Sequence, residues 1–298
     1  MQKAVIFSIL MVIAMVFWGS SWPAGKVLTK YASADIITFW RFFFAFLASI
    51  PLVAFLKIPL RIDTNALKFL LLAAICNALY SIVYFMGLRY GSAGKGGVLV
   101  TTLTPVFAYL LIYFFRRIKK EKAEIKNNEI LGIILGIISG ICLLNLGSFE
   151  ELFGKFNTIF VFCAMDWALL TIICQKIRIH PLAINFYITL LSLLMYAPLF
   201  LFKGEEMVQI FSFGGEFWGM LFVVSVLSTA IGTSIYYMGI AAVGATKAST
   251  FPLLVPATAL LSSYVILGEI PSFLTLFGGS LAIFATYLIN IYRPKSKS

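Results

Sequence analysis

The sequence carries little charge, and acids are the scarcer sign. Charged residues make up 12% of the 298 residues, roughly half the share of a soluble globular domain, and 12 acids oppose 23 lysines and arginines. Apolar residues make up 61%. A soluble domain of this length cannot bury so much apolar surface, because the buried fraction rises only slowly with chain length. Lipid must therefore be the solvent for most side chains.

Histidine and cysteine are also sparse, which excludes several kinds of catalytic site. His180 is the single histidine, so the sequence offers neither a zinc site nor a Ser–His triad. The four cysteines (Cys76, Cys142, Cys163 and Cys174) lie in apolar segments without metal or redox spacing. No glycine-rich phosphate loop occurs, so we expect no ATP-driven motor. We expect no cofactor and no metal.

Long apolar runs are what the sequence has in abundance. A helix needs about 20 apolar residues to cross the hydrocarbon core, and an open sheet cannot satisfy its backbone there. We therefore expect an all-α membrane protein with ten transmembrane helices. Two expected spans carry one charge each, Arg41 and Asp166. The expected spans are 4–25, 36–56, 69–88, 96–115, 130–149, 156–175, 181–202, 217–246, 248–268 and 270–292.

Lysines and arginines are distributed unevenly over the loops between these spans. If the N-terminus is cytoplasmic, 16 of them lie on that side and 6 on the other. Cytoplasmic loops carry the excess of basic residues, so we expect both termini on the cytoplasmic side of the inner membrane of a cell. The densest run, residues 116–120, is then a topology anchor. No groove interleaves basic and aromatic residues, so we expect no nucleic-acid partner.

The second half of the sequence repeats the first. Trp18 matches Trp167 at an offset of 149 residues, and residues 84–87 match residues 236–239 at an offset of 152. A drift of a few residues over a whole half is what duplication with small loop changes leaves. Further matches pair Thr38-Phe39-Trp40 with Asn185-Phe186-Tyr187, Pro51 with Pro198, Lys95 with Lys247, and Pro105 with Pro256.

Each repeat, residues 1–148 and residues 149–298, contains five expected spans. Because five is odd, the two repeats must insert with opposite orientation, as a 5+5 inverted-topology repeat. This architecture places a binding site near the midplane, between the halves. Related halves can also exchange conformations, so inward-open and outward-open states have similar energies. We therefore expect alternating access.

The order and spacing of several short motifs resemble the EamA family of the drug/metabolite transporters along nearly the whole chain. The matches are Trp18-Gly19, Trp40-Arg41-Phe42, Gly87-Leu88-Arg89-Tyr90, Thr102-Leu103-Thr104-Pro105-Val106-Phe107, Trp167-Ala168, Ala248-Ser249, Pro256 and Leu267-Gly268-Glu269. The resemblance implies ten helices around a central cavity, lined mainly by the first, third, fourth, sixth, eighth and ninth. It also implies export or exchange of small organic solutes such as amino acids. Two departures are Asp166, which precedes the sixth-span tryptophan, and the Leu-Gly-Glu ending, which only the second half has.

Polar residues recur at matched positions in the two repeats. Asn77, Ser81 and Tyr84 share one face of the third span, because they are spaced i, i+4 and i+7. The eighth span carries polar residues at the same spacing. Two explanations remain open, namely hydrogen bonds between helices and the lining of a wet cavity. The candidate substrate-cavity residues are Trp18, Ser21, Asn77, Ser81, Tyr84, Thr101, Asp166, Trp167, Thr229, Thr233 and Tyr236.

Asp166 stands in the middle of its span, where an acid costs about 2.5–3.5 kcal/mol. Burial also favours the neutral form of such a group. Asp166 is either a neutral acid hydrogen-bonded to a neighbour or a functional group. In the second case it carries protons or attracts an amine of the substrate, which makes the proton a candidate coupling ion.

Three cations are candidate gate or entrance charges. Lys95 and Lys247 begin the fourth and ninth spans on opposite membrane faces. Each either snorkels to the interface or attracts a carboxylate together with the helix N-terminus. Arg41 stands about one turn into the second span, where snorkelling, a pair with Asp35 and a gate salt bridge are the alternatives. Candidate hinge or kink positions are Pro105, Pro256 and Gly94.

The function expected from the sequence is secondary transport of small organic metabolites such as amino acids, by an exporter or an exchanger. The expected partners are a small-molecule substrate and the lipid bilayer. Drug-like or quaternary-amine cations and nucleosides are alternative substrates. A membrane-embedded enzyme would need clustered catalytic groups, whereas the acids at the span ends are scattered. A scaffold or receptor would not require an inverted repeat. The oligomeric state is left open.

Overall fold

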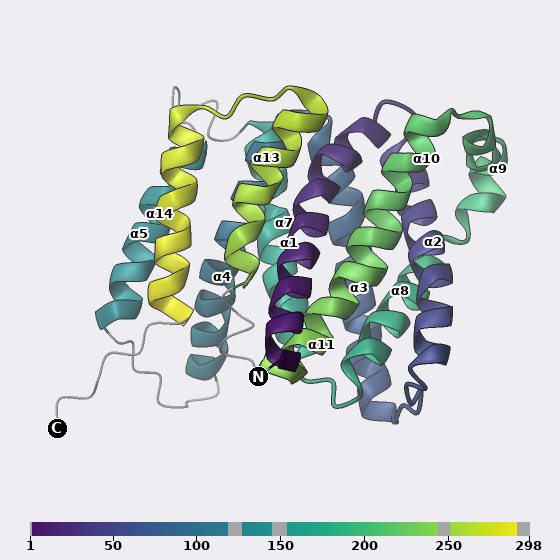
Figure 1. Cartoon of the computed structure of the whole chain (residues 1–298), viewed down its shortest axis with the longest axis horizontal. Helices are drawn as coiled ribbons and strands as arrows, with labels where there is room; N and C mark the ends of the chain where they lie inside the picture. The colour runs from purple at the N-terminus through teal and green to yellow at the C-terminus, as the bar shows by residue number, and fades with distance from the viewer. Residues whose placement is uncertain (1, 119–126, 145–153, 244–250, 291–298) are drawn as a thin grey trace.

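The computed structural model describes residues 2–118, 127–144, 154–243 and 251–290. All regular structure within these ranges is helical, which confirms the fold class predicted from the apolar runs. Figure 1 shows the helices standing side by side in one bundle, with α5 and α14 at one end and α9 at the other.

Five helices form the first half of the bundle. α3 begins where the side chain of Asp63 accepts a hydrogen bond from the backbone N–H of Ala66 at 2.6 Å, which caps the helix. Pro23, Pro51 and Pro105 lie inside helices that continue through them. The helices are α1 (Gln2–Leu28), α2 (Ala34–Phe55), α3 (Thr64–Leu88), α4 (Ala93–Ile118) and α5 (Asn127–Leu144).

The second half is more broken than the first. Its third crossing changes from α-helix to π-helix and back without leaving the helical path. The elements are α7 (Lys155–Cys174), α8 (Pro181–Tyr196), α9 (Leu199–Gln209), η1 (Ile210–Ser212), α10 (Gly215–Phe222), the π-helical stretch η2 (Val223–Gly232), α11 (Thr233–Val243), η3 (Phe251–Leu254), α13 (Val255–Leu267) and α14 (Phe273–Asn290).

Six helices of the described residues are long and apolar enough to cross a membrane by themselves. They are α1 to α4, α7 and the continuous stretch Gly215–Gly239, and a seventh crossing arises if α8 and α9 form one broken span. Three shorter apolar helices lie at Ile130–Leu143, Phe251–Leu267 and Phe273–Ala285. The structure is therefore that of a multi-pass membrane protein, whereas the full count of ten crossings stays a prediction.

Residues 181–202, predicted as one span, form two helices with a sharp bend between them. α8 ends at Tyr196, and the chain bends by 98° before α9. Pro198 stands at the bend, and it cannot continue the hydrogen bonding of α8 because it has no backbone N–H. α9 exposes Leu201 and Phe202, each 82% accessible. Its direction and its bare apolar side chains are typical of a helix that lies along a membrane surface.

Related helices of the two halves run in opposite directions. At the face drawn uppermost in Figure 1, called the upper face below, Lys26 at the end of α1 contacts Gly91, just before α4, and Glu269, just after α13. The N-terminal ends of α7 and α10 and the C-terminal end of α3 lie at this face too. α1 therefore ends where its repeat partner α7 begins, and α4 begins where α13 ends. This is the arrangement that five spans per repeat predicted.

The packing between the halves follows the same two-fold relation. α1 packs against α13 and η2, and its repeat partner α7 packs against α4 and α3 in the equivalent way. α2 packs against its repeat partner α8, and α5 packs against its repeat partner α14. The two-fold relation therefore maps each of these pairs onto itself. Small residues permit the closest approach: a Cβ added at Gly19 would lie 2.7 Å from the backbone of Ala259, and one at Gly97 would lie 2.7 Å from its Cβ. Helices of each half therefore pack directly against helices of the other half.

Candidate functional site

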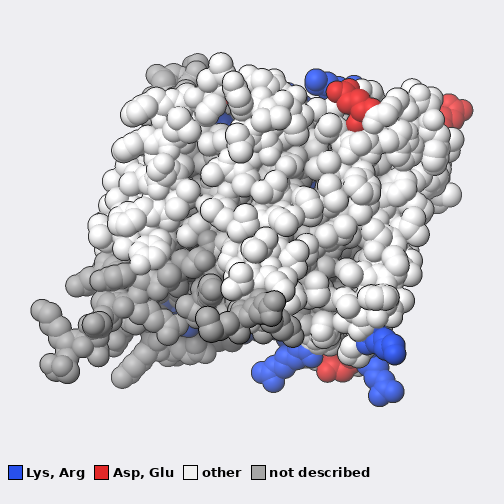
Figure 2. Space-filling view, in the orientation of Figure 1, with Lys and Arg blue, Asp and Glu red and all other residues white. Residues whose placement is uncertain are grey.

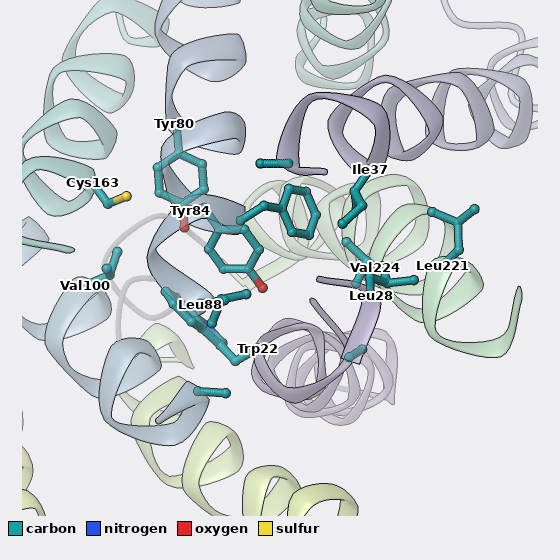
Figure 3. Close-up of a cluster of buried hydrophobic side chains, with 14 of the residues drawn as sticks. Trp22, Leu28, Ile37, Tyr80, Tyr84, Leu88, Val100, Cys163, Leu221 and Val224 are labelled. Atoms are coloured by element: carbon teal, nitrogen blue, oxygen red, sulfur yellow. The ribbon is translucent and has the colours of Figure 1, made fainter. Parts of the chain in front are cut away.

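Aromatic side chains fill the middle of the bundle, between α1, α3, α4 and α7. Figure 3 shows Trp22 beside Tyr84, with Tyr80 one turn away on the same helix as Tyr84. Ring centroids lie 4.8 Å apart for Trp22 and Tyr84, and 5.8 Å apart for Tyr80 and Tyr84. The hydroxyl of Tyr84 donates to the backbone oxygen of Ser21 at 2.7 Å, which satisfies its buried polar end. The structure thus brings together two predicted cavity residues, Ser21 and Tyr84.

Two further predicted residues, Trp18 and Trp167, extend this aromatic core across the interface between the halves. The ring of Trp18 lies 5.2 Å from that of Tyr236 on α11, and the ring of Trp167 lies 4.8 Å from that of Tyr80 on α3. Both tryptophans keep part of their surface accessible. Each repeat-related tryptophan therefore contacts a tyrosine of the opposite half, although Tyr80 lies one turn before Tyr84, the repeat match of Tyr236.

Arg41 of α2 reaches the second half of the chain. Its Nε and Nη2 each lie 3.3 Å from the hydroxyl oxygen of Thr229 on η2. Its guanidinium carbon lies 5.7 Å from the ring centre of Tyr84 and 5.9 Å from that of Phe85, within the range of a cation–π contact. The alternative of a pair with Asp35 is wrong, because Asp35 pairs with Lys203 of α9 at 2.7 Å.

The π-helical stretch η2 shapes the surroundings of Arg41. The hydroxyl of Thr229 donates to the backbone oxygen of Val224, five residues earlier, at 2.8 Å. The backbone oxygen of Thr229 accepts a hydrogen bond from the side-chain amide of Asn185 on α8 at 3.3 Å. π-Helical turns inside α-helices are often found at functional sites. Here the irregular turn gives one threonine contacts with both α2 and α8.

The two predicted polar stripes do not face one common cavity. Asn77 donates to the hydroxyl of Ser192 on α8 at 3.0 Å, which is a hydrogen bond between helices. Ser81 is fully buried, and its hydroxyl has no partner within the described part of the chain. The hydroxyl of Thr233 lies 3.4 Å from the backbone oxygen of Ser228. The stripes therefore make hydrogen bonds both between the halves, as at Asn77, and within one half, as at Thr233.

Asp166 of α7 is 6% exposed and lies next to Cys76 of α3. Its Oδ2 has no partner among the described residues. The two ion pairs in that part of the chain lie elsewhere, so no cation there offsets a charge on this carboxyl. Since a buried unpaired charge is costly, the neutral acid is the cheaper form at this position.

The remaining predicted cations and cavity residues are dispersed. The Lys95 ammonium lies 5.5 Å from the ring centre of Phe156, at the upper end of α4. The hydroxyl of Thr101 donates to the backbone oxygen of Gly97 at 2.6 Å, within its own helix. Lys247 lies outside the described residues.

The predicted hinge positions differ in their settings. A Cβ at Gly94 would lie 3.1 Å from the side chain of Leu260 and 3.2 Å from that of Ser263, so this glycine permits close packing of α4 on α13. Pro105 lies inside the continuous helix α4. Pro256 is the second residue of α13, where it starts a helix rather than kinking one, because no backbone N–H is needed there.

A carboxylate closes the upper face between the halves. Glu269 accepts hydrogen bonds from Lys26 at 2.7 Å, from the hydroxyl of Ser92 at 2.7 Å, and from the backbone N–H groups of Ala93 and Gly94 at 3.1 Å each. Burial alone would raise the pKa of Glu269, but these four donors outweigh it and hold the pKa below its ordinary value. The carboxylate also sits at the positive N-terminus of α4.

Two more contacts of charged groups cross the halves at the upper face. Asp35 at the start of α2 pairs with Lys203 of α9, and Tyr31 after α1 donates to Glu216 at the start of α10. We call these contacts, together with the Lys26–Glu269 pair, the upper latch. All three join the first half to the second at the upper face.

Comparison with known proteins identifies the family. A family model described as the EamA-like transporter family matches residues 5–146 and again residues 156–291. The chain belongs to this family. "Uncharacterized transporter YetK" of Bacillus subtilis (strain 168) is 25% identical, with 95% of this chain and 86% of the relative covered. An "Uncharacterized transporter" of Archaeoglobus fulgidus is 23% identical, with 94% and 97% covered. A protein of known crystal structure shares the fold, with a TM-score of 0.66 and 14% identity over 95% of this chain and 96% of that one.

The match confirms the resemblance to the EamA family that the sequence motifs indicated. The family model matches once in each half of this EamA-like protein, as the internal repeat requires. Figure 2 shows most visible charged side chains in two bands, along the upper and the lower edge, with an uncharged belt between them. Such a belt suits the hydrocarbon core of a bilayer.

Three residues of the site in this EamA-like protein escaped the sequence analysis. Glu269 entered only as part of a motif, Asn185 only as a repeat match, and Lys26 only in the count of basic loop residues. Lys26 and Glu269 are separated by 243 positions in sequence, so no local pattern links them. The usable signal was the Leu267-Gly268-Glu269 ending, which only the second half carries.

Proposed function

We propose that this EamA-like protein is a secondary transporter that moves small organic metabolites, such as amino acids, across the cytoplasmic membrane by alternating access. Its two five-helix units, 1–148 and 149–298, cross the bilayer ten times in total. They lie in opposite orientations, with both termini in the cytoplasm. The upper face is then the outer face of the membrane.

The observation that carries this proposal is that Arg41 and the upper latch both make contacts between the two halves. Arg41 contacts Thr229, and all three contacts of the upper latch join one half to the other. A rocking motion of the halves about the central site would break the latch while the central residues stay in reach of a solute. A static scaffold has no need of such contacts.

Alternating access makes a direct prediction for flux. Purified protein in proteoliposomes should take up or exchange radiolabelled L-amino acids faster than protein-free vesicles do. In a variant without native cysteines, Lys26→Cys and Glu269→Cys joined by a bifunctional reagent that links them through disulfides should stop this flux, and a reductant should restore it. Flux that persists with the upper face cross-linked would contradict alternating access.

The same vesicles separate the other functions. Uptake of quaternary amines or nucleosides in place of amino acids would change the substrate class but keep the mechanism. No flux of any of these solutes would favour an enzyme or a scaffold. A pH gradient that drives uptake would identify the proton as the coupling ion.

A further inference from the structure

Arg41 is a cation inside a membrane span without an acid beside it. It is the eighth residue of α2, about 10 Å along a helix that rises about 1.5 Å per residue. Charged side chains at such depth usually pair with one another, because an unpaired charge in the membrane is costly. Within the described residues the ion pairs are Lys26–Glu269 and Lys203–Asp35, and neither includes Arg41.

Among the described residues, the neighbours of Arg41 leave most of its donors unused. A guanidinium carries five N–H donors, and here two of its nitrogens share one hydroxyl oxygen, that of Thr229, at 3.3 Å. That distance is slightly longer than usual for an N–H···O hydrogen bond. The proton of the Thr229 hydroxyl is already donated to Val224. The other near neighbours are the ring faces of Tyr84 and Phe85, which stabilise a cation but accept no strong hydrogen bond.

The free donors of this planar guanidinium match a planar anion with two oxygens. Arginine forms paired, parallel hydrogen bonds with carboxylates, and these are stronger than bonds between neutral groups. The place is also right for a solute, since Arg41 lies between α2, α3 and η2 and so joins the two halves. Asn185, which already holds Thr229 from α8, fixes the position of the hydroxyl beside the guanidinium.

We infer that Arg41, positioned by its contact with Thr229, binds the carboxylate of the transported solute at the interface between the halves. This inference rests on the proposed transport function and narrows its substrate class to solutes with a free carboxylate.

The test is the thermal stability of the purified full-length protein in the presence of matched ligands, because a bound ligand stabilises the folded state by mass action. The ligands are the standard L-amino acids, their methyl esters and the corresponding decarboxylated amines. We expect the compounds that raise the Tm to be free acids, with their esters and amines at least about 30-fold weaker, as for the loss of one buried charged partner. This comparison needs no variant, so it decides the question even where a variant fails to fold.

Variants then assign the effect to the residue. Arg41→Gln should abolish the shift produced by the free acids, and Arg41→Lys should keep a smaller one, because lysine retains the charge without the planar fork. Arg61→Gln removes an exposed loop cation and should leave the shift unchanged. An equal shift with Arg41→Gln, an equal shift from acids and esters, or no shift from any free acid would each overturn the inference.

Flux measurements separate this inference from the proposed function. Carboxylate binding that depends on Arg41 but is accompanied by no flux in vesicles would leave the binding site intact and contradict transport. Flux of amines or nucleosides that is unchanged by Arg41→Gln would preserve transport and contradict the carboxylate site.

Discussion

Arg41 and Asp166 interrupt otherwise apolar spans, and the structure gives them different surroundings. Arg41 contacts a hydroxyl and two ring faces across the interface between the halves, whereas Asp166 is buried with one oxygen free of any described partner. Among the described residues, neither Arg41 nor Asp166 has a partner of opposite charge.

Asp166 tests whether protons take part in transport. We expect Asp166→Asn to remove the stimulation of uptake by a pH gradient, because asparagine keeps the shape and the hydrogen bonding of the acid but cannot carry a proton. Uptake into proteoliposomes at several external pH values measures this. Cys163→Ser, on the same helix and buried, is the control for disturbed packing. Wild-type flux with wild-type pH dependence in Asp166→Asn would reject the role.

Glycines at the interface fix how closely the halves approach. A Cβ at Gly19 would lie 2.3 Å from the hydroxyl oxygen of Thr258 and 2.7 Å from the backbone of Ala259. We expect Gly19→Ala to lower the free energy of unfolding by about 1–3 kcal/mol, the usual cost of overpacking. Gly215→Ala has no atom within 4 Å of the new Cβ and is the matched control. Thermal unfolding in detergent compares the two, and equal midpoints would show that α1 and α13 can move apart freely.

Among the structural elements, the upper latch should depend on pH through the charge of Glu269. The pKa of Glu269 is lowered in the closed state, because its four hydrogen-bond donors outweigh its burial. At a pH above the ordinary glutamate pKa, Glu269 is ionised and stabilises the state in which its pKa is lowered. This stabilisation is lost as the pH falls through the lowered pKa. Closure of the upper face should therefore weaken only in acid, below the ordinary glutamate pKa of about 4.3.

Glu269→Gln should mimic that acidification at neutral pH. We expect a cysteine placed at Leu260 on α13, in a background without native cysteines, to react about tenfold faster with a membrane-impermeant thiol reagent, which corresponds to about 1.4 kcal/mol. Glu205→Gln on α9 removes an exposed acid outside the latch and should leave the rate unchanged. Equal rates for both variants would show that the Lys26–Glu269 pair does not hold the face closed.

The sequence predicted the positions of the helices better than the side-chain contacts between them. Hydropathy places the helices because each apolar run must lie in lipid regardless of its neighbours. The offset repeat predicted the antiparallel relation of α1 to α7 and of α4 to α13. The bend at Pro198 was missed, since the apolar run continues through Phe202 and composition alone does not show that a helix has turned. The contacts of Arg41 and Lys26 depend on tertiary packing, which no local spacing encodes.

At the scale of the whole molecule, the proposal requires an even number of crossings. The start of α1 and the end of α14 both lie at the lower side in Figure 1. Tags added at residue 1 and at residue 298 should therefore both be protected from an external protease in intact cells, and a tag in the loop at Lys30 should be cleaved. Opposite behaviour of the two terminal tags would contradict the paired, inverted units.

The shortness of α8 sets a relation between this protein and the thickness of its bilayer. With 16 residues, α8 is about 24 Å long at about 1.5 Å per residue, whereas the hydrocarbon core measures about 30 Å. The bilayer around the second half must become thinner, or α9 must move toward the hydrocarbon core. Either adjustment costs free energy that grows with the difference between helix length and bilayer thickness. Vesicles of shorter acyl chains should therefore support faster turnover than vesicles of longer ones.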